Sequence, residues 1–276
     1  MATHKRKSAP DAKKKKISLI IKIAIIVGMI IVASVIVLTS PIFNISSVVV
    51  EGNKILSSEQ IVTAAALPQE GNVFLGVSGS FFDKVFLTFS AYKNNLTEKY
   101  VEIKSVDMSY SLGGKVTIVV HERTPFAYIP SGKRFLLVDT EGVVLKVYLK
   151  KPNDKMMIIF GMKISANKIG DNVGFDINPE IKKIKRLLSL FKNNPEIPKS
   201  ITGNIIAFNV ERPLNLEMLL LGGKRVLLGD IDQLGDPDVY SHFKRIKVVL
   251  ESNAVKGKGV LDYSTPDLEP FWSPKK

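Results

Sequence analysis

The feature that most constrains this chain is a predominantly apolar run of 22 residues, residues 17–38, that contains one charged residue, Lys22. A helix of this length spans about 33 Å, which is enough to cross the roughly 30 Å hydrocarbon core of a bilayer. Seven Lys and Arg residues precede the run, and none follows it before Lys54. The positive-inside rule therefore predicts a cytoplasmic N-terminus, with residues 39–276 outside the membrane.

The alternative to an anchor is a cleaved signal peptide, which also begins with basic residues and continues with an apolar stretch. The apolar region of a signal peptide is typically about 7–15 residues long, and it ends at a cleavage site of the Ala-x-Ala kind. This run is longer, and residues 35–41 offer no such site. We therefore expect an uncleaved single-pass anchor over residues 17–38, preceded by a basic cytoplasmic tail, residues 1–16, that is drawn to anionic lipids.

Charge and composition narrow the class of protein further. The net charge is +13, of which +6 lies in residues 1–16 and +7 in the rest of the chain. The sequence lacks the clustered aromatic residues of a single-strand nucleic-acid platform, so nucleic-acid binding is not expected. The positive charge that is spread over the rest of the chain suits a surface that faces an anionic cell wall or lipid headgroups.

The chain has no cysteine, which excludes disulfides, thiol nucleophiles and thiolate metal sites.

The first external region, residues 41–123, has the pattern of a small α+β domain. It predicts a strand that ends at a Gly-Asn turn, a helix with a capping box, a second helix over residues 79–96, and two strands joined by a hairpin. The residues that carry these predictions are Phe43, Ile45, Val48 and Val50 in the first strand, Ser57, Gln60, Ile61, Ala64 and Ala65 in the first helix, Phe82, Val85, Phe86, Phe89 and Tyr92 in the second helix, and Gly113 and Gly114 in the hairpin turn. The two helices are expected to cover one face of the sheet.

The two ends of this region resemble a known family. The pattern F-x-I-x-x-V-x-V-x-G-N follows the apolar run, and V-x-I-x-V-x-E-R-x-P-x-A, residues 116–127, closes the region. Together they resemble a POTRA domain of the FtsQ/DivIB type. The chain departs from the family at residues 99–101, where Lys-Tyr-Val stands in place of a frequent Pro-aromatic-Val motif.

The second external region, residues 124–263, reads as short strands separated by turn residues, with two helices. The predicted strands are residues 126–129, 135–138, 143–148, 156–160, 205–210, 214–221, 225–228 and 259–263, and the predicted helices are residues 179–191 and 237–252. The first of these helices has an apolar stripe formed by Ile181, Ile184, Leu187, Leu188 and Phe191. Residues 264–276 are expected to form a short Pro-rich C-terminal tail.

This order of parts is similar to that of the FtsQ/DivIB family over nearly the whole chain. The resemblance implies an α+β fold with a single N-terminal transmembrane helix, a POTRA domain of the order strand-helix-helix-strand-strand, and a mainly antiparallel β domain with helices. It also implies a non-enzymatic scaffold of the bacterial division complex at the septum. Its partners would be FtsB/DivIC-like and FtsL-like membrane proteins that dock by strand addition along the last strand of the β domain. That strand corresponds here to Gly259, Val260, Leu261, Asp262 and Tyr263. The alternative for these residues is an ordinary sheet edge guarded by Lys256 and Lys258.

Each candidate for catalysis or metal binding falls short of its motif. Residues 76–80 place the second glycine one position too early for a nucleophile elbow. Residues 230–241 begin like a calcium loop but have Leu234 and Ser241 at ligand positions, so Asp236 and Asp238 are expected instead to cap the start of a helix and to complement its charge. We therefore predict no catalytic residue, metal, cofactor or small-molecule substrate. The second hypothesis is a membrane-anchored enzyme that binds or cleaves the cell wall, which would require convergent carboxylate, His or Ser side chains in one cleft.

Overall fold

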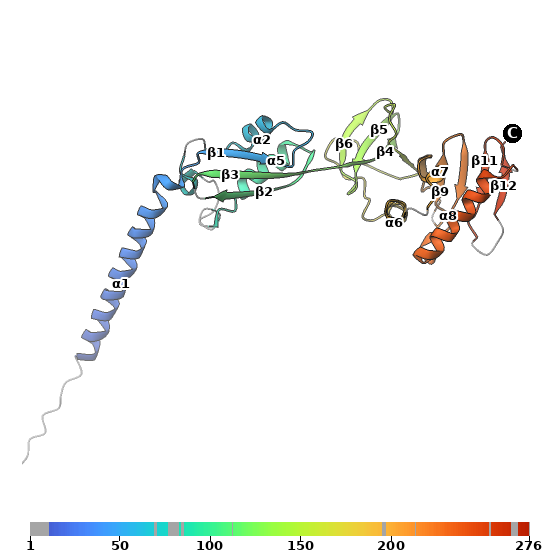
Figure 1. Ribbon diagram of the computed structural model, residues 1–276. Coiled ribbons are helices and arrows are strands. Elements are labelled where there is room, and N and C mark those ends of the chain that lie inside the picture. The colour runs from blue at the N-terminus through green and yellow to red at the C-terminus, as the bar shows by residue number, and fades with distance from the viewer. Residues whose placement is uncertain are drawn as a thin grey trace, which may run out of the picture. The chain divides into compact units, whose positions relative to one another are not determined.

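The computed structural model describes residues 11–68, 71–76, 83, 86–111, 113–194, 197–212, 214–253, 255–265 and 270–275 (Figure 1). The chain divides into two compact units, Met1–Glu122 and Arg123–Lys276, which we call the first and the second unit. The first unit begins with helix α1, Asp11–Leu38. Its segment Lys16–Leu38 has a mean hydropathy of 3.0 and is not buried. It is the one helix of the described residues that is long and apolar enough to cross a membrane.

The rest of the first unit is built on a three-stranded sheet of β1 (Ser47–Glu51), β2 (Ile103–Ser111) and β3 (Lys115–Glu122). The strand order is β1-β3-β2, with β1 parallel and β2 antiparallel to β3. Gly113 and Gly114 have φ angles of +96° and +87°, which L-residues with a side chain rarely adopt. The predicted hairpin between β2 and β3 is therefore confirmed.

The sheet packs with helices α2 (Ser58–Ala65), α3 (Val73–Gly76) and α5 (Ser90–Lys99). The predicted capping box of α2 is present, because Ser57 and Gln60 exchange side-chain to backbone hydrogen bonds. Every second residue of β3 is buried, in keeping with the period of a strand that has one covered face. These residues form one apolar core with the buried faces of α2 and α5, and its fully buried members include Ile61, Ala65, Leu96, Val116 and Ile118.

Two predictions for the first unit are wrong. The continuous helix expected over residues 79–96 is interrupted, because α5 begins at Ser90 and both Leu87 and Phe89 have left-handed backbone angles. Phe82 and Val85, which were assigned to that helix, lie outside the described residues. The first strand begins at Ser47, because Pro41–Phe43 forms a 3₁₀ turn that starts with the fixed backbone angle of proline.

The second unit contains one mixed sheet of nine strands in the order β12-β11-β10-β9-β8-β7-β4-β5-β6. Most neighbouring strands are antiparallel; β7 runs parallel to β4 and β8, and β11 runs parallel to β10. The strands are β4 (Pro125–Ser131), β5 (Arg134–Asp139), β6 (Val144–Tyr148), β7 (Ile158–Phe160), β8 (Ile205–Asn209), β9 (Glu217–Leu220), β10 (Lys224–Leu227), β11 (Gly259–Asp262) and β12 (Phe271–Pro274). The helical elements are α6 (Pro179–Asn193), α7 (Lys199–Thr202), η2 (Ile231–Gln233) and α8 (Asp236–Glu251).

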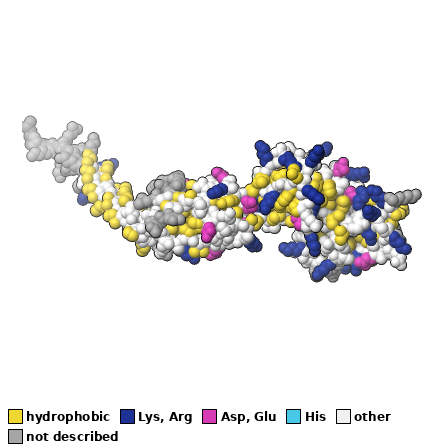
Figure 2. Space-filling view, turned by 90° about the horizontal axis from the view of Figure 1, so that it is seen from above, with side chains coloured by type: hydrophobic (Ala, Val, Ile, Leu, Met, Phe, Trp, Pro, Cys, Tyr) yellow, Lys and Arg dark blue, Asp and Glu magenta, His cyan; other side chains and the backbone are white. Residues whose placement is uncertain are grey.

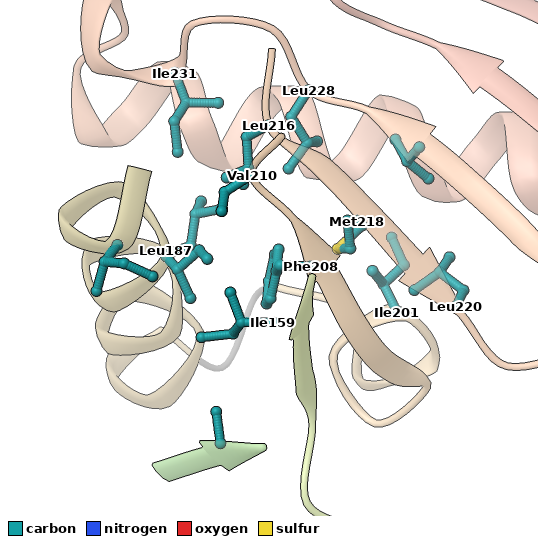
Figure 3. Close-up of a cluster of buried hydrophobic side chains, with 14 of the residues drawn as sticks. Ile159, Leu187, Ile201, Phe208, Val210, Leu216, Met218, Leu220, Leu228 and Ile231 are labelled. Atoms are coloured by element: carbon teal, nitrogen blue, oxygen red, sulfur yellow. The ribbon is translucent and has the colours of Figure 1, made fainter. Parts of the chain in front are cut away.

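The helices α6 and α8 bury their apolar stripes against this sheet. Leu187 of α6 belongs to the same buried cluster as Ile159 of β7 and Phe208 of β8, and Figure 3 shows these side chains together. Burying a side chain of this size contributes about 1.5–3 kcal/mol relative to leaving it in water. Helix α6 and the strands β7 and β8 therefore share one apolar core.

The end of the chain differs from the expected tail. Residues 271–274 form β12, which pairs antiparallel with β11. The strand was missed because Pro274 lies within it and Pro270 precedes it, and proline usually argues against a strand. The predicted last strand, residues 259–263, is consequently not the last one.

Candidate functional site

The candidate site is the end of the nine-stranded sheet formed by β10, β11 and β12. Of the five residues predicted to bind a partner, Gly259, Val260, Leu261 and Asp262 make up β11, and Tyr263 follows it directly. Strand β11 is paired on both sides, parallel with β10 and antiparallel with β12. The open edge expected at these residues is therefore occupied by β12.

Strand β12 is seated on β11 by a close contact with glycine. A Cβ atom at Gly259 would clash with the ring of Trp272 and with the carbonyl oxygen of Ser273, so only glycine allows this approach. Trp272 is partly buried and packs against the core of the second unit. Leu261, which lies opposite Trp272 on β11, is fully buried. The position of β12 is thus determined by side-chain packing as well as by its ladder of hydrogen bonds.

The direction of each backbone amide in β12 follows from the register. Lys275 N donates to Lys258 O at 2.9 Å, so these two residues stand at a hydrogen-bonding position of the ladder. In an antiparallel ladder such positions alternate, and the next hydrogen-bonded pairs are Val260 with Ser273 and Asp262 with Phe271. The amides of Ser273 and Phe271 therefore point to β11.

The alternate residues of β12 point the other way. Trp272 directs its N–H and its carbonyl oxygen away from β11, toward the side of β12 on which no described strand pairs. Pro274 shares this direction, as does Pro270 just before the strand. Proline has no N–H, so it is tolerated in a strand where the amide would face an open edge. The two prolines therefore stand at the positions that only an edge strand can accept.

The side chains beside this edge fall on two faces. Residues directly opposite one another share a face, so Val260, Ser273, Asp262 and Phe271 lie on one face, which we call the outer face. Phe271 is 67% exposed there, although it is a large apolar residue. Lys258 and Lys275, at the other end of the same register, add positive charge to this face.

The opposite face is covered by α8, where His242 packs edge-on against Tyr263 with ring centroids 3.8 Å apart. His242 is buried, and its Nε2 has no hydrogen-bond partner among the described residues. Burial lowers the pKa of His242 to about 4, and the nearby Arg245 contributes in the same direction. His242 is therefore neutral at ordinary pH and acts as an aromatic packing residue behind β11.

A polar hollow of about 380 Å³ opens on the outer face near β11. It is lined by Val260 together with Arg225 of β10 and the buried Glu217 of β9. Arg225 Nη1 lies 3.0 Å from Glu217 Oε1, and Asn209 Nδ2 donates to Glu217 Oε2 at 3.1 Å. The carboxylate is thus held by two neighbours, which suits a structural role in the sheet.

The acids that resemble the start of a calcium loop are engaged by cations from α6. Lys183 is 2% exposed, and its Nζ lies 2.8 Å from Asp230 and 2.9 Å from Glu180. Burial lowers the pKa of Lys183, but its hydrogen bonds to Asp230 and Glu180 outweigh burial and raise the pKa overall. Asp236 and Asp238 lie in the first turn of α8, where their charge complements the helix as predicted, but the predicted cap is wrong, because the N-cap residue is Gly235 and makes no side-chain hydrogen bond. Sequence reasoning missed the partner of Asp230 because a lysine on a helix is usually solvated.

The positive charge is less evenly spread than the composition suggested. Residues 17–122 contain 7 Lys and Arg and 8 Asp and Glu, a net charge of −1. Residues 123–276 contain 25 Lys and Arg and 17 Asp and Glu, a net charge of +8. Lys and Arg side chains are prominent on the face of the second unit seen in Figure 2. The positive charge beyond residue 16 therefore belongs to the second unit.

The apolar helix and the α+β unit that follows it define a class of protein, the POTRA proteins with an N-terminal candidate membrane span. A family model described as the POTRA domain, FtsQ-type, matches residues 43–123. A cell division protein DivIB of Clostridium acetobutylicum is 25% identical over 227 residues, which cover 81% of this chain and 80% of the relative. A DivIB of Clostridium tetani is 24% identical over 217 residues, 79% of this chain and 74% of the relative. The resemblance to the FtsQ/DivIB family noted in the sequence is confirmed: residues 43–123 match the FtsQ-type POTRA domain, and about four fifths of the chain is similar to DivIB cell division proteins.

Proposed function

We propose that this chain is a non-enzymatic scaffold of the division complex, and that it recruits FtsB/DivIC-like and FtsL-like partners at the septum by strand addition. Its family supports a role in division. The observation that carries the docking mode is the outer edge of β12, which ends the sheet with backbone groups that no described strand pairs, beside an exposed aromatic residue. An added strand gains affinity from main-chain hydrogen bonds and specificity from alternate side chains.

The other end of the same sheet is a poorer docking edge. The backbone of β6 is already engaged on its open side at Val144, which donates to Asp171 O at 2.8 Å and accepts from Gly170 N at 2.9 Å. The remaining part of β6 carries the exposed Lys146, and lysine on an edge strand discourages pairing. The edge of β12 has no comparable cover among the described residues and is therefore the better candidate.

The five residues first assigned to partner binding keep a part in this proposal. Val260 and Asp262 lie on the outer face, one strand behind Ser273 and Phe271, where side chains of a docked strand would reach them. Gly259 and Leu261 hold Trp272, and Tyr263 anchors the end of β11 against α8. These residues would thus support the docking strand and border it, while β12 supplies the hydrogen bonds.

We also propose that the N-terminus is cytoplasmic and that both units lie outside the membrane. The seven basic residues ahead of the apolar helix support this orientation. The net charge of +8 on the second unit suits an anionic surrounding such as the cell wall or lipid headgroups. The orientation would bring β12 to the side where septal partners expose their extracytoplasmic segments.

The test uses two proline variants of the full chain. The Val260 amide points to β12 and the Leu261 amide points to β10, so proline breaks a different ladder in each variant. Val260→Pro should detach β12, leave the melting temperature of the second unit within a few degrees of the natural chain, and weaken capture of the DivIC-like partner at least tenfold. Leu261→Pro should unfold the second unit, because it also removes a fully buried side chain.

Capture is measured by co-purification of the partner from detergent-solubilised membranes, and folding by circular dichroism and calorimetry. Lys256 precedes β11, and the variant Lys256→Ala serves as the control, which should capture the partner as the natural chain does. If Val260→Pro is folded and captures the partner as the natural chain does, neither β11 nor β12 is the docking edge.

A further inference from the structure

The edge of β12 has an unusual set of hydrogen-bonding groups. Within residues 270–275, all of which are described, the outward-facing positions are Pro270, Trp272 and Pro274. All three offer a carbonyl oxygen, but Trp272 alone offers an N–H. The edge is therefore rich in acceptors and has a single donor.

This imbalance affects two kinds of incoming strand differently. An ordinary antiparallel strand, with an N–H at every position, would form a complete pair with Trp272 and donate one further bond to each proline carbonyl, about four hydrogen bonds in all. In a symmetric pairing of two copies of β12, Trp272 faces its own copy and gives about two hydrogen bonds. The Pro270 and Pro274 carbonyls would then face each other without any donor, and unpaired acceptors removed from water are costly.

We propose that the prolines of β12 make this edge selective, so that it accepts a strand from a different protein and rejects a second copy of this chain. This inference rests on the proposed function only in taking the edge as a docking site. It adds that Pro270 and Pro274 determine which strands can dock. A sheet edge that must stay open for a partner is at risk of pairing with itself, and proline is one of the few residues that limits this without closing the edge.

The side chains of the outer face indicate which residue types the incoming strand should carry. Residues of that strand opposite Phe271 and Ser273 would sit in non-hydrogen-bonded pairs, in which Cα atoms are about 4.5 Å apart and side chains are in close contact. An apolar residue opposite Phe271 would cover its exposed ring. Four residues away, an acidic residue would face Lys275 and the neighbouring Lys258. The partner segment should therefore have free amides, an apolar residue and an acid at that spacing.

The experiment restores the missing donors. In the double variant Pro270→Ala/Pro274→Ala, two copies can form about six hydrogen bonds in place of about two. The full chain in detergent should then self-associate at least tenfold more tightly than the natural chain, as measured by sedimentation over a range of concentrations. Ser273→Ala is the matched control, because its amide already faces β11, and it should behave as the natural chain does.

Several outcomes separate this inference from the function it builds on. A double variant that is folded by circular dichroism and no more self-associating than the natural chain overturns the selectivity of the prolines. If the double variant is misfolded, Pro274→Ala alone restores one donor and should give an intermediate increase; no increase there overturns the inference equally. Failure of the natural chain to capture its partner would instead count against strand addition, because the self-association measurement needs no partner.

Discussion

The two units of this chain are stabilised by different kinds of interior. The buried polar or charged residues of the described chain, Asp139, Glu180, Lys183, Glu217 and His242, all lie in the second unit. The described core of the first unit is made of apolar residues and tyrosine. The two parts of the chain also differ in net charge, which is −1 for residues 17–122 and +8 for residues 123–276.

This difference indicates which unit has a stability that depends on pH and on single charges. Apolar burial is indifferent to pH, so the stability of the first unit depends on packing and on local caps. The second unit includes ionisable groups whose protonation changes with folding, and its stability is linked to pH and to single charges. The unit that carries the candidate docking edge is thus also the one whose stability depends on ion pairs.

The largest effect is expected from Lys183, the buried lysine between α6 and the loop that precedes α8. Lys183→Met keeps the apolar stem but leaves the buried Glu180 and its neighbour Asp230 without their cation. Breaking a buried ion pair in this way costs about 3–5 kcal/mol. We expect the transition of the second unit, followed by calorimetry of the full chain, to shift to much lower temperature while the transition of the first unit stays in place.

The control for this variant is its neighbour on the same helix. Lys182 is exposed, so Lys182→Met should change the stability of either unit by less than about 0.5 kcal/mol. Equal effects of the two substitutions would mean that the buried network does not stabilise the second unit.

A second, smaller effect is expected from His242 and depends on pH. The folded His242 keeps its neutral form down to about pH 4, whereas an unfolded histidine takes up a proton near pH 6.5. Between these values the unfolded state binds more protons, so the second unit loses stability as the pH falls, by roughly 3 kcal/mol over the whole interval. The charged group that acts on His242 is Arg245; its ring neighbours Tyr263 and Phe243 are uncharged.

His242→Phe should remove this dependence. Phenylalanine keeps an aromatic ring against Tyr263, and the Nε2 of His242 has no hydrogen bond to lose among the described residues. Denaturant unfolding at pH 7 and at pH 4.5 should show the natural chain losing about 2–3 kcal/mol more than the variant. The same loss in both chains would assign the acid sensitivity to the carboxylates instead.

The sequence predicted those parts of the fold that rest on strong local patterns. The apolar run, the capping box of Ser57 and Gln60, the Gly-Gly hairpin and the stripe of α6 all appear in the structure. Each is a short-range signal, because the residues that produce it are neighbours on one element. The break at Leu87 and Phe89 carries no such signal, since non-glycine residues enter the left-handed region only when surrounding structure requires it.

The candidate site was predicted one strand away from where the structure places the open edge. Val260 and Leu261 read correctly as a strand, but its position within the sheet depends on residues more than ten positions further along the chain. Phe271 and Trp272 are too few to give a pattern, and the flanking prolines argue against a strand unless the edge is already known. Pairing order in a sheet is a long-range property, which local patterns do not report.

The smallest effect should fall on the first unit alone and comes from the last residue of β3. The Glu122 carboxylate accepts hydrogen bonds from the backbone N–H groups of Lys54, Ile55 and Leu56, at 2.9–3.0 Å. Glu122→Gln keeps the shape but removes the charge and one acceptor oxygen, which should cost about 1–2 kcal/mol. Calorimetry of the full chain should show a lower transition for the first unit and an unchanged one for the second.

The adjacent residue provides the opposite test of the same comparison. Arg123 lies next to Glu122 in the chain, yet its guanidinium contacts Asp139 at 2.7 Å and Glu141 at 2.9 Å, both in the second unit. Arg123→Gln should therefore lower the transition of the second unit only, because the buried Asp139 loses its cation. If either substitution moves both transitions together, the two units do not unfold separately, and the contrast between an apolar and an ionic interior would have no consequence for stability.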